Sequence, residues 1–278
     1  MPEIKIKDQN PHCSKHVLSP VRVFHGDCLE IMKSIPDVSI DMILCDLPYG
    51  TTACKWDVII PFDKLWEQYE RIIKPNGAIV LTASQPFTSA LIMSNPKLFK
   101  VEWIWEKNAG SNFGSVKFQP MKEHENILVF GKSTVKYFPI PEKRSESGLA
   151  RVLSSDMTYH ANKNEDYLYG TFKKETFKSK APELRVPRSI QKFKRERGLH
   201  PTQKPVPLFE YLIKTYTNEG ETVLDNCAGS GTTAIACINT KRNCILIEKE
   251  EKYFDIINER IAKHTQQLAG EFSFENEL

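Results

Sequence analysis

Strand-length apolar runs alternate with segments of helical period along most of this chain, and this alternation limits its fold more than any other feature. Residues 40–45 and 78–83 are nearly continuous apolar runs, which is typical of strands buried on both faces. Between them, residues 62–73 repeat apolar side chains at the spacing of an amphipathic helix. The pattern predicts a doubly wound α/β sheet with mostly parallel strands.

The same periodicities predict further elements on both sides of a less regular middle segment. Strands are expected at 21–24, 101–105, 126–130, 221–225 and 243–247, and helices at about 28–34, 85–93, 207–216, 232–238 and 250–264. Ser84 is predicted to cap the helix that begins at residue 85. Residues 1–19 show no periodicity and are predicted to form a loose N-terminal arm.

The alternation fails between residues 132 and 199, and this segment is strongly basic. Residues 132–204 hold 17 Lys and Arg against 8 Asp and Glu, a net charge of +9, so the rest of the chain carries −6 within a total of +3. Polar composition and four prolines predict an insert with little core of its own. A basic segment on an acidic body indicates a polyanionic partner, and Arg185, Arg188, Lys192, Lys194, Arg195 and Arg197 are the predicted phosphate contacts.

The apolar run at 40–45 stops at a carboxylate. Asp46 ends the run, and Leu47, Pro48 and Tyr49 follow before a glycine. An apolar strand that enters such a loop places this acid at the carboxyl edge of the sheet, where open α/β sheets bind ligands.

A second strand, at 221–225, runs into a glycine-rich turn and then a helix. Small residues in this turn allow a ligand to approach the backbone, and the start of the helix offers free N–H groups. Glu248 ends the next strand, 17 residues after Gly231, where an acid can accept both ribose hydroxyls of a nucleoside. Ala234 replaces the third glycine of a dinucleotide fingerprint, and no P-loop lysine follows, so NAD and ATP fit poorly.

Three motifs together resemble those of amino-group DNA methyltransferases. Residues 46–49, Asp-Leu-Pro-Tyr, are similar to the Asp-Pro-Pro-Tyr motif of that family, with Leu47 in place of the first proline. Residues 225–233 resemble the S-adenosylmethionine loop Asp-x-Phe-x-Gly-x-Gly-Thr-Thr, with Cys227-Ala228 where Phe-x is usual, and residues 200–205 match His-Pro-Thr-Gln-Lys-Pro. The catalytic motif precedes the cofactor loop, which is the order of the beta subgroup of the family.

The resemblance implies a circularly permuted, seven-stranded sheet of the S-adenosylmethionine-dependent methyltransferase type. It divides the chain into the arm at 1–19, a catalytic half at 20–131, a basic insert in the place of the target-recognition region at 132–199, and a cofactor-binding half at 200–278.

The implied reaction is transfer of a methyl group from S-adenosyl-L-methionine to the N6 amine of an adenine flipped out of double-stranded DNA. The Asp46 carboxylate and the Leu47 carbonyl would accept the two amine hydrogens, Pro48 would hold Leu47 extended, and Tyr49 would stack on the base. The implied cofactor-binding residues are Asp27, Asp46, His200, Thr202, Gln203, Lys204, Asp225, Ala228, Gly229, Ser230, Gly231, Thr232, Thr233 and Glu248. No metal site is predicted.

Several alternatives stay open at this point. An Asp at the first motif position favours adenine N6, whereas cytosine N4 enzymes more often carry Ser there, so cytosine N4 is the nearest alternative. Methyltransferases of RNA or of protein glutamine usually begin the tetrapeptide with Asn and place it after the cofactor loop, and both features disagree here. An inactive nucleic-acid-binding module is the third alternative, against which the intact Asp46, Pro48 and Tyr49 argue. The chain has no Pro-Cys dipeptide, which argues against methylation at cytosine C5.

Cysteine usage and hydropathy bear on the compartment. The seven cysteines include no Cys-x-x-Cys, no run approaches the ~18 apolar residues of a membrane span, and the first residues lack a secretory apolar block. We therefore expect a cytoplasmic protein without membrane contact. Because members of the family are often dimers, a homodimer and a cognate restriction endonuclease acting on the same site stay open as partners beside double-stranded DNA.

Overall fold

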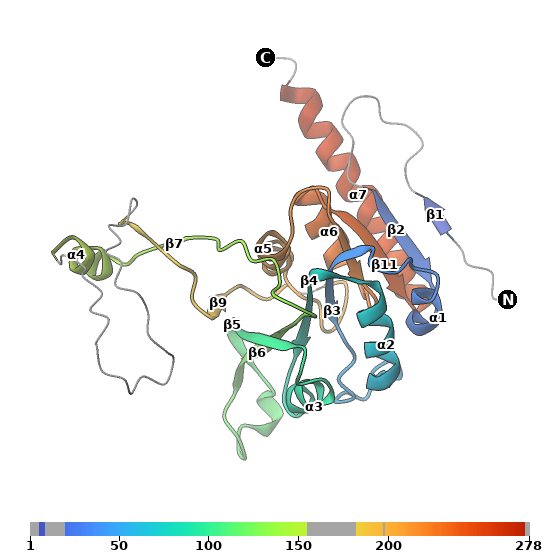
Figure 1. Ribbon diagram of the computed structural model, residues 1–278, viewed down its shortest axis with the longest axis horizontal. Coiled ribbons are helices and arrows are strands. Elements are labelled where there is room, and N and C mark those ends of the chain that lie inside the picture. The colour runs from blue at the N-terminus through green and yellow to red at the C-terminus, as the bar shows by residue number, and fades with distance from the viewer. Residues whose placement is uncertain (1–5, 9–19, 155–181, 197, 276–278) are drawn as a thin grey trace. The chain divides into compact units, whose positions relative to one another are not determined.

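The computed structural model describes residues 6–8, 20–154, 182–196 and 198–275. They form two compact units, one of residues 139–188 and one of the described residues on either side of that segment. The larger unit is built on one twisted sheet with helices on both of its faces (Figure 1).

The described part of this sheet has nine strands. In spatial order they are β1 (Ile6–Asp8), β2 (Val21–His25), β11 (Asn243–Glu248), β10 (Thr222–Asp225), β3 (Ile40–Asp46), β4 (Ile73–Ala83), β6 (Lys122–Phe130), β5 (Phe99–Ser111) and β9 (Ile190–Lys192). The strands from β2 to β4 are parallel, and β6 runs antiparallel between β4 and β5. The predicted doubly wound, mostly parallel sheet is confirmed. Its seven strands from β2 to β5 are extended by two three-residue strands, β1 and β9.

The connectivity of the sheet is permuted. The late strands β10 and β11 lie between the early strands β2 and β3, so both ends of the chain contribute to the middle of the sheet. A pairing of this kind brings the loop after β3 next to the loop after β10, although the two are far apart in the sequence.

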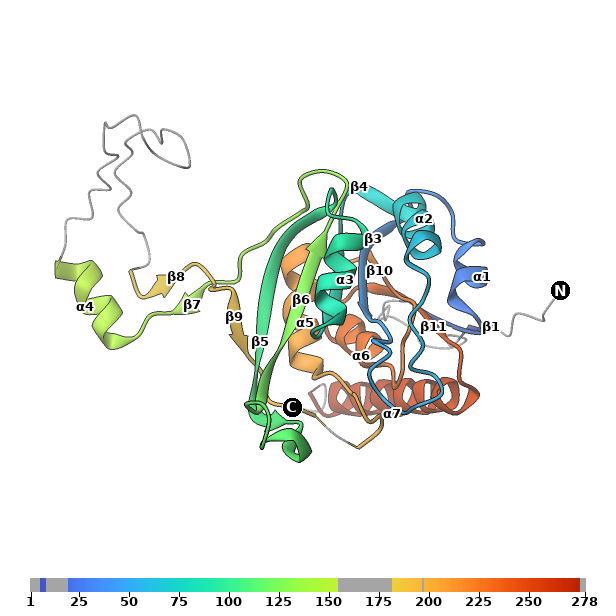
Figure 2. The same ribbon diagram turned by 90° about the horizontal axis from the view of Figure 1, so that it is seen from below.

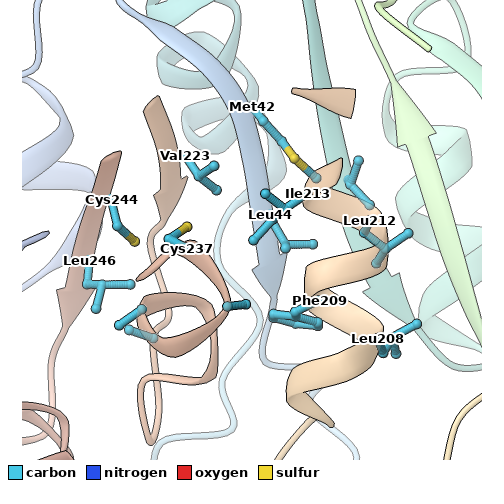
Figure 3. Packing of buried hydrophobic residues seen from close by; sticks show 14 of the residues in the cluster. Met42, Leu44, Leu208, Phe209, Leu212, Ile213, Val223, Cys237, Cys244 and Leu246 are labelled. Atoms are coloured by element: carbon cyan, nitrogen blue, oxygen red, sulfur yellow. The ribbon is translucent and has the colours of Figure 1, made fainter. Parts of the chain in front are cut away.

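Helices cover the two faces and bury alternate residues of the central strands (Figure 2). One face carries α1 (Cys28–Met32), α2 (Phe62–Ile72) and α3 (Phe87–Ser94), and the other carries α5 (Val206–Tyr216), α6 (Thr232–Asn239) and α7 (Glu251–Glu275). In β3, Met42 and Leu44 pack toward α5, as Figure 3 shows, whereas Ile43 and Cys45 join the cluster with α1, α2 and α3. Burial on both faces explains why this strand is apolar at almost every position.

Two predicted details are wrong for identifiable reasons. β4 begins at Ile73 rather than at residue 78, because the chain passes from α2 directly into the strand. A Cβ atom on Gly77 would lie 2.8 Å from the Asp41 carbonyl oxygen, so close strand packing requires this glycine. Ser84 does not cap α3. The N-cap is Pro86, and the Ser84 hydroxyl accepts a hydrogen bond from Lys122 instead.

The smaller unit contains β7 (Glu142–Lys143), α4 (Glu146–Ser154) and β8 (Leu184–Arg185), with β7 and β8 paired antiparallel. None of its described side chains belongs to the two large buried clusters. Residues 132–138 and 189–196 were assigned to the insert from the sequence, but they belong to the larger unit, where β9 pairs with β5. No helix in the described ranges combines the length and the apolar character that crossing a membrane requires.

Candidate active site

Four neighbouring parallel strands each deliver one acid to the same edge of the sheet. β3 ends at Asp46, β10 at Asp225 and β11 at Glu248, and Asp27 lies two residues after β2. The strands are aligned by their pairing, Leu224 opposite Ile43 and Asp225 opposite Leu246. The two loops singled out in the sequence therefore meet at one rim.

These strand ends border a cavity of about 390 Å³. All four predicted catalytic residues line it, and so do most of the predicted cofactor-binding residues: Asp27, His200, Thr202, Gln203, Lys204, Asp225, Ala228, Gly229, Ser230, Thr232 and Glu248. Gly231 and Thr233 are not part of the lining. Gly231 is the left-handed N-cap of α6, and the fully buried Thr233 donates its hydroxyl to Asp225, so both support the glycine loop from behind.

Asp46 is held by three donors. The Tyr49 hydroxyl donates to its Oδ1 at 2.7 Å, and the Thr82 hydroxyl donates to the same oxygen. The Lys204 Nζ lies 2.5 Å from its Oδ2. Because a carboxylate offers about four acceptor positions, one position on Oδ2 is left for a further donor from the cavity.

Lys204 connects Asp46 to Glu125, an acid on β6 that no motif indicated. The Lys204 Nζ lies 3.4 Å from Oε2 of Glu125, whose Oε1 accepts a hydrogen bond from Lys107 at 2.5 Å. Burial opposes the charged form of Lys204, but the carboxylates of Asp46 and Glu125 outweigh it and raise the pKa. Burial likewise opposes ionisation of Glu125, but Lys204 and Lys107 outweigh it and lower the pKa. The available signal was an acid directly before the predicted strand at 126–130.

Tyr49 is held by its neighbours in the protein. Its hydroxyl is bonded to Asp46 and lies 3.1 Å from the Thr82 hydroxyl oxygen, and its ring stacks on Phe87 with the ring centroids 5.0 Å apart and 27° between the planes. The Lys204 Nζ lies 5.7 Å from the centroid of the same ring. Burial, together with the negative charges of Asp46 and Glu125, raises the pKa of Tyr49 well above its ordinary value. The phenol is therefore a neutral donor that orients the Asp46 carboxylate.

Glu248 is bonded directly to the glycine loop. The backbone N–H of Gly229 donates to its Oε2 at 2.7 Å, and that of Glu250 donates to its Oε1 at 2.9 Å. Burial raises the pKa of Glu248, although these two amides oppose that effect. Each oxygen keeps acceptor capacity, as pairing with two adjacent hydroxyl groups requires.

The loop after Tyr49 forms a wall of the cavity that the motifs did not indicate. Asp57 is buried and accepts hydrogen bonds from the backbone amides of Gly50, Thr51 and Thr52 at 2.8, 2.9 and 2.7 Å. Burial opposes its ionisation, but these hydrogen bonds outweigh it and lower the pKa of Asp57. One carboxylate thus closes the turn that begins at Gly50.

His200 packs between rings from two other segments. Its ring centroid lies 4.3 Å from that of Tyr253 and 5.1 Å from that of Trp56. Burial lowers the pKa of His200, so the ring is neutral at pH 7, and its Nδ1 accepts the backbone N–H of Thr202 at 3.2 Å. The predicted segment at 200–205 is therefore fixed against the cavity by packing as well as by hydrogen bonds.

The basic residues predicted to contact DNA lie in both units. The larger unit contains Lys192, Lys194 and Arg195, the smaller unit contains Arg185 and Arg188, and Arg197 lies outside the described residues. None of the five described residues lines the cavity. Across the described ranges, no three His, Cys, Asp or Glu side chains are grouped closely enough to hold a metal ion.

Comparison with known proteins agrees with this geometry. A family model described as DNA methylase matches residues 40–259. The chain is 26% identical over 277 residues to the type II methyltransferase M2.MboI of Moraxella bovis, covering 90% of each chain. It is 28% identical over 258 residues to the DNA adenine methyltransferase YhdJ of Escherichia coli (strain K12), covering 83% of this chain and 79% of that one.

A solved structure has the same fold. The crystal structure of the M1.HpyAVI-SAM complex matches with a TM-score of 0.57 and 26% identity, covering 87% of this chain and 98% of that chain. The family model spans well over half of the chain and contains both loops of the cavity. This protein therefore belongs to the DNA methylase family.

Proposed function

We propose that this DNA methylase transfers a methyl group from S-adenosyl-L-methionine to the N6 amine of an adenine in double-stranded DNA. The observation that carries the proposal is the single cavity lined by Asp46, the glycine loop and Glu248. The names of the similar proteins support it, because YhdJ is a DNA adenine methyltransferase and M1.HpyAVI was solved as a complex with SAM.

The residues of the cavity fit this cofactor. Glu248 presents a buried carboxylate for the two ribose hydroxyls, and Gly229, at φ 52°, brings bare backbone against the same acid. Leu29 of α1 and Ile60 of the loop before α2 supply apolar lining. When bound, the cofactor supplies an electrophilic methyl group on a sulfonium.

The chain's own residues would prepare the attacking amine. The exocyclic amine of adenine is a poor nucleophile, because its lone pair is delocalised into the ring. The free position on Oδ2 of Asp46 and the Leu47 carbonyl would accept the two amine hydrogens and aim the lone pair. Lys204, Tyr49 and Thr82 hold the carboxylate in place beforehand, so the contribution is positioning and electrostatics in a site shielded from water.

The target base must leave the duplex to reach this cavity, at a cost of a few kcal/mol. We propose that the basic insert at residues 132–199 recognises the target and that its basic residues contact DNA phosphates. A homodimer and a cognate restriction endonuclease stay predictions from the family resemblance.

Asp46→Ala tests the catalytic assignment. The variant should lose methyl transfer by roughly 10²-fold or more, since it removes an acceptor that acts on the reacting amine. Affinity for S-adenosyl-L-methionine, measured by calorimetry, should change only slightly. Asp37→Ala, which removes an exposed acid on the same unit, should keep both properties. Normal methylation by Asp46→Ala would make the assignment wrong.

The wild-type protein decides the substrate in the same assay. It is incubated with labelled cofactor and duplex DNA, RNA or protein, and labelled nucleic acid is digested to nucleosides. We expect label in N6-methyl-2′-deoxyadenosine from duplex DNA. Label in N4-methyl-2′-deoxycytidine would select the cytosine alternative, and label in RNA or protein alone would contradict the proposal.

A further inference from the structure

The hairpin of β5 and β6 ends in a loop, residues 112–121, that exposes a cluster of apolar side chains. Phe113 is 76% exposed and Phe118 is 89% exposed, and Val116 and Met121 are also on the surface. Within residues 112–122 the charged residues are Lys117 and Lys122, with no acid. Isolated exposed apolar residues are ordinary, but a cluster of four at one tip marks an interaction site.

The loop is a built structure that presents these side chains outward. Its base is closed by the Asn112 side chain, which accepts the Lys122 backbone N–H at 2.9 Å. Residues Phe113–Ser115 form a short 3-10 helix, and the Ser115 carbonyl accepts the N–H groups of Phe118 and Gln119 at 2.9 and 3.1 Å. Because these backbone groups are paired within the loop, the rings are not exposed through loss of local structure.

The loop stands at the edge of the sheet that carries the cavity. β6 is antiparallel to β4 and pairs Asn126 with Ala83, so Lys122 and the loop before it lie beyond the end of β4. The Lys122 Nζ donates to Ser84, two residues after Thr82, which is bonded to Asp46. Figures 1 and 2 show the hairpin tip projecting past the end of the sheet.

Positive charge continues beside the loop along the hairpin. Asn108 of β5 accepts the backbone N–H of Arg195 at 2.9 Å, and this places the basic residues 192–195 along the same strand. Lysines are depleted from the cores of protein–protein interfaces, and a symmetric contact between two copies would bring the loop lysines together. Aromatic side chains with adjacent cations, and with no acid inside the loop itself, suit a polyanion with stacked bases instead, although the exposed Glu123 directly follows Lys122.

We propose that the loop at 112–121 is a wedge that inserts Phe118 into the base stack of duplex DNA and fills the space left by the extruded adenine. This inference rests on the proposed function, because it requires a base that leaves the duplex. Lys117 and Lys122 contact the flanking phosphates. The stacking of Phe118 offsets part of the cost of extrusion, so the wedge matters most when the target base is paired.

Two duplexes test the wedge after the methylated position has been mapped on plasmid DNA. One duplex pairs the target adenine normally, and the other carries an abasic site opposite it, so that extrusion breaks no base pair. Phe118→Ala should lower kcat/KM on the paired duplex by roughly tenfold or more, the effect of removing one aromatic ring that stacks on a base. On the abasic duplex the loss should stay within about twofold. Met93→Ala, which removes a 71% exposed apolar side chain from α3, should match wild type on both.

Each other outcome has one meaning. Equal losses on the two duplexes, or no loss on either, would show that Phe118 does not act in extrusion. A change of oligomeric state in Phe118→Ala, measured by sedimentation, would assign the loop to self-association and overturn the wedge. If wild type methylates no adenine of the plasmid DNA, the proposed function is wrong and the wedge with it. If wild type methylates both and Phe118→Ala behaves as Met93→Ala, the proposed function stands and the wedge alone is wrong.

Discussion

Two acids at the site, the partly buried Glu125 and the buried Asp225, are stabilised in different ways. Glu125 is paired with Lys204 and Lys107, which lower its pKa despite burial. Asp225 has neutral donors instead, the Thr233 hydroxyl and the Cys227 backbone N–H, so burial raises its pKa to about 6. The two pKa shifts differ in direction because the neighbours differ. Glu125 on β6 lies beside two lysines, whereas Asp225 ends β10, a strand in the middle of the sheet, and has only neutral donors.

The raised pKa of Asp225 predicts a measurable dependence of stability on pH. Between its ordinary pKa of 3.8 and the folded value of about 6, the folded protein binds more protons than the unfolded chain, so the free energy of unfolding falls as pH rises. Asp225→Asn lacks this titration. The free energy of unfolding of the variant minus that of wild type, measured by urea denaturation, should therefore increase by about 2 kcal/mol between pH 4 and pH 7.

A substitution without a titratable group provides the control for that measurement. Met93→Ala changes an exposed apolar side chain, so its stability difference from wild type should stay nearly constant over the same pH range. A constant difference for Asp225→Asn as well would show that the folded carboxyl titrates normally.

The loop between β10 and α6 depends on left-handed backbone at two glycines. Gly229 has φ 52° and Gly231 has φ 76°. A Cβ atom on Gly231 would lie 3.2 Å from a side-chain carbon of Ile257 on α7, so the position is restricted by packing as well as by φ. The glycine loop is therefore positioned by its hydrogen bond to Glu248 and by packing against α7.

Gly231→Ala should destabilise the fold and weaken cofactor binding several-fold, because the loop must shift away from Ile257. Gly220→Ala is a matched control, since Gly220 has φ 77° and open space around the added Cβ atom. In both variants, the strain of an alanine in left-handed backbone should lower the free energy of unfolding by about 1–2 kcal/mol. The additional loss of stability and the loss of affinity, measured by denaturation and calorimetry, should occur in Gly231→Ala alone. Equal affinities in the two variants would contradict the role of this packing.

The charge of the whole molecule is divided between regions. Residues 132–204 carry a net +9 and the rest of the chain carries −6. In the larger unit, the Phe193 carbonyl accepts the Trp105 indole N–H at 2.9 Å, which anchors the segment and leaves Lys192 and Lys194 exposed beside β5. Lysines and arginines that contact DNA phosphates release the counterions bound to the DNA. DNA is therefore expected to bind to this basic region and not to the acidic remainder of the chain.

Lys194→Ala should weaken binding to duplex DNA about equally for all sequences. It should also reduce the slope of log K against log salt by about one, as expected when one phosphate contact is lost. Lys33→Ala, which removes the exposed lysine that follows α1 as its C-cap, should leave the slope unchanged. Fluorescence anisotropy over a range of salt concentrations measures both. An unchanged slope for Lys194→Ala would remove this residue from the DNA contacts.

The sequence alone determined the type of fold and the rim at which the site forms. A helix or strand that is buried on one or two faces repeats its apolar residues at a characteristic spacing in the sequence. Most strands and helices of the larger unit were therefore predictable to within a few residues. Both motif loops follow strands at the carboxyl edge of one predicted sheet, where ligands bind, and both line the same cavity.

Tertiary structure decided which side chains meet. The pairing of Lys204 with Glu125, the stacking of Tyr49 on Phe87 and the closure of the Gly50 turn by Asp57 join residues whose local sequence carries no shared pattern. Pairing of charges and close packing depend on which strands are neighbours. The strand order places β6 beside β4 and β10 beside β3. It is determined by the packing of the whole chain, so the spacing of apolar residues within one segment does not predict it.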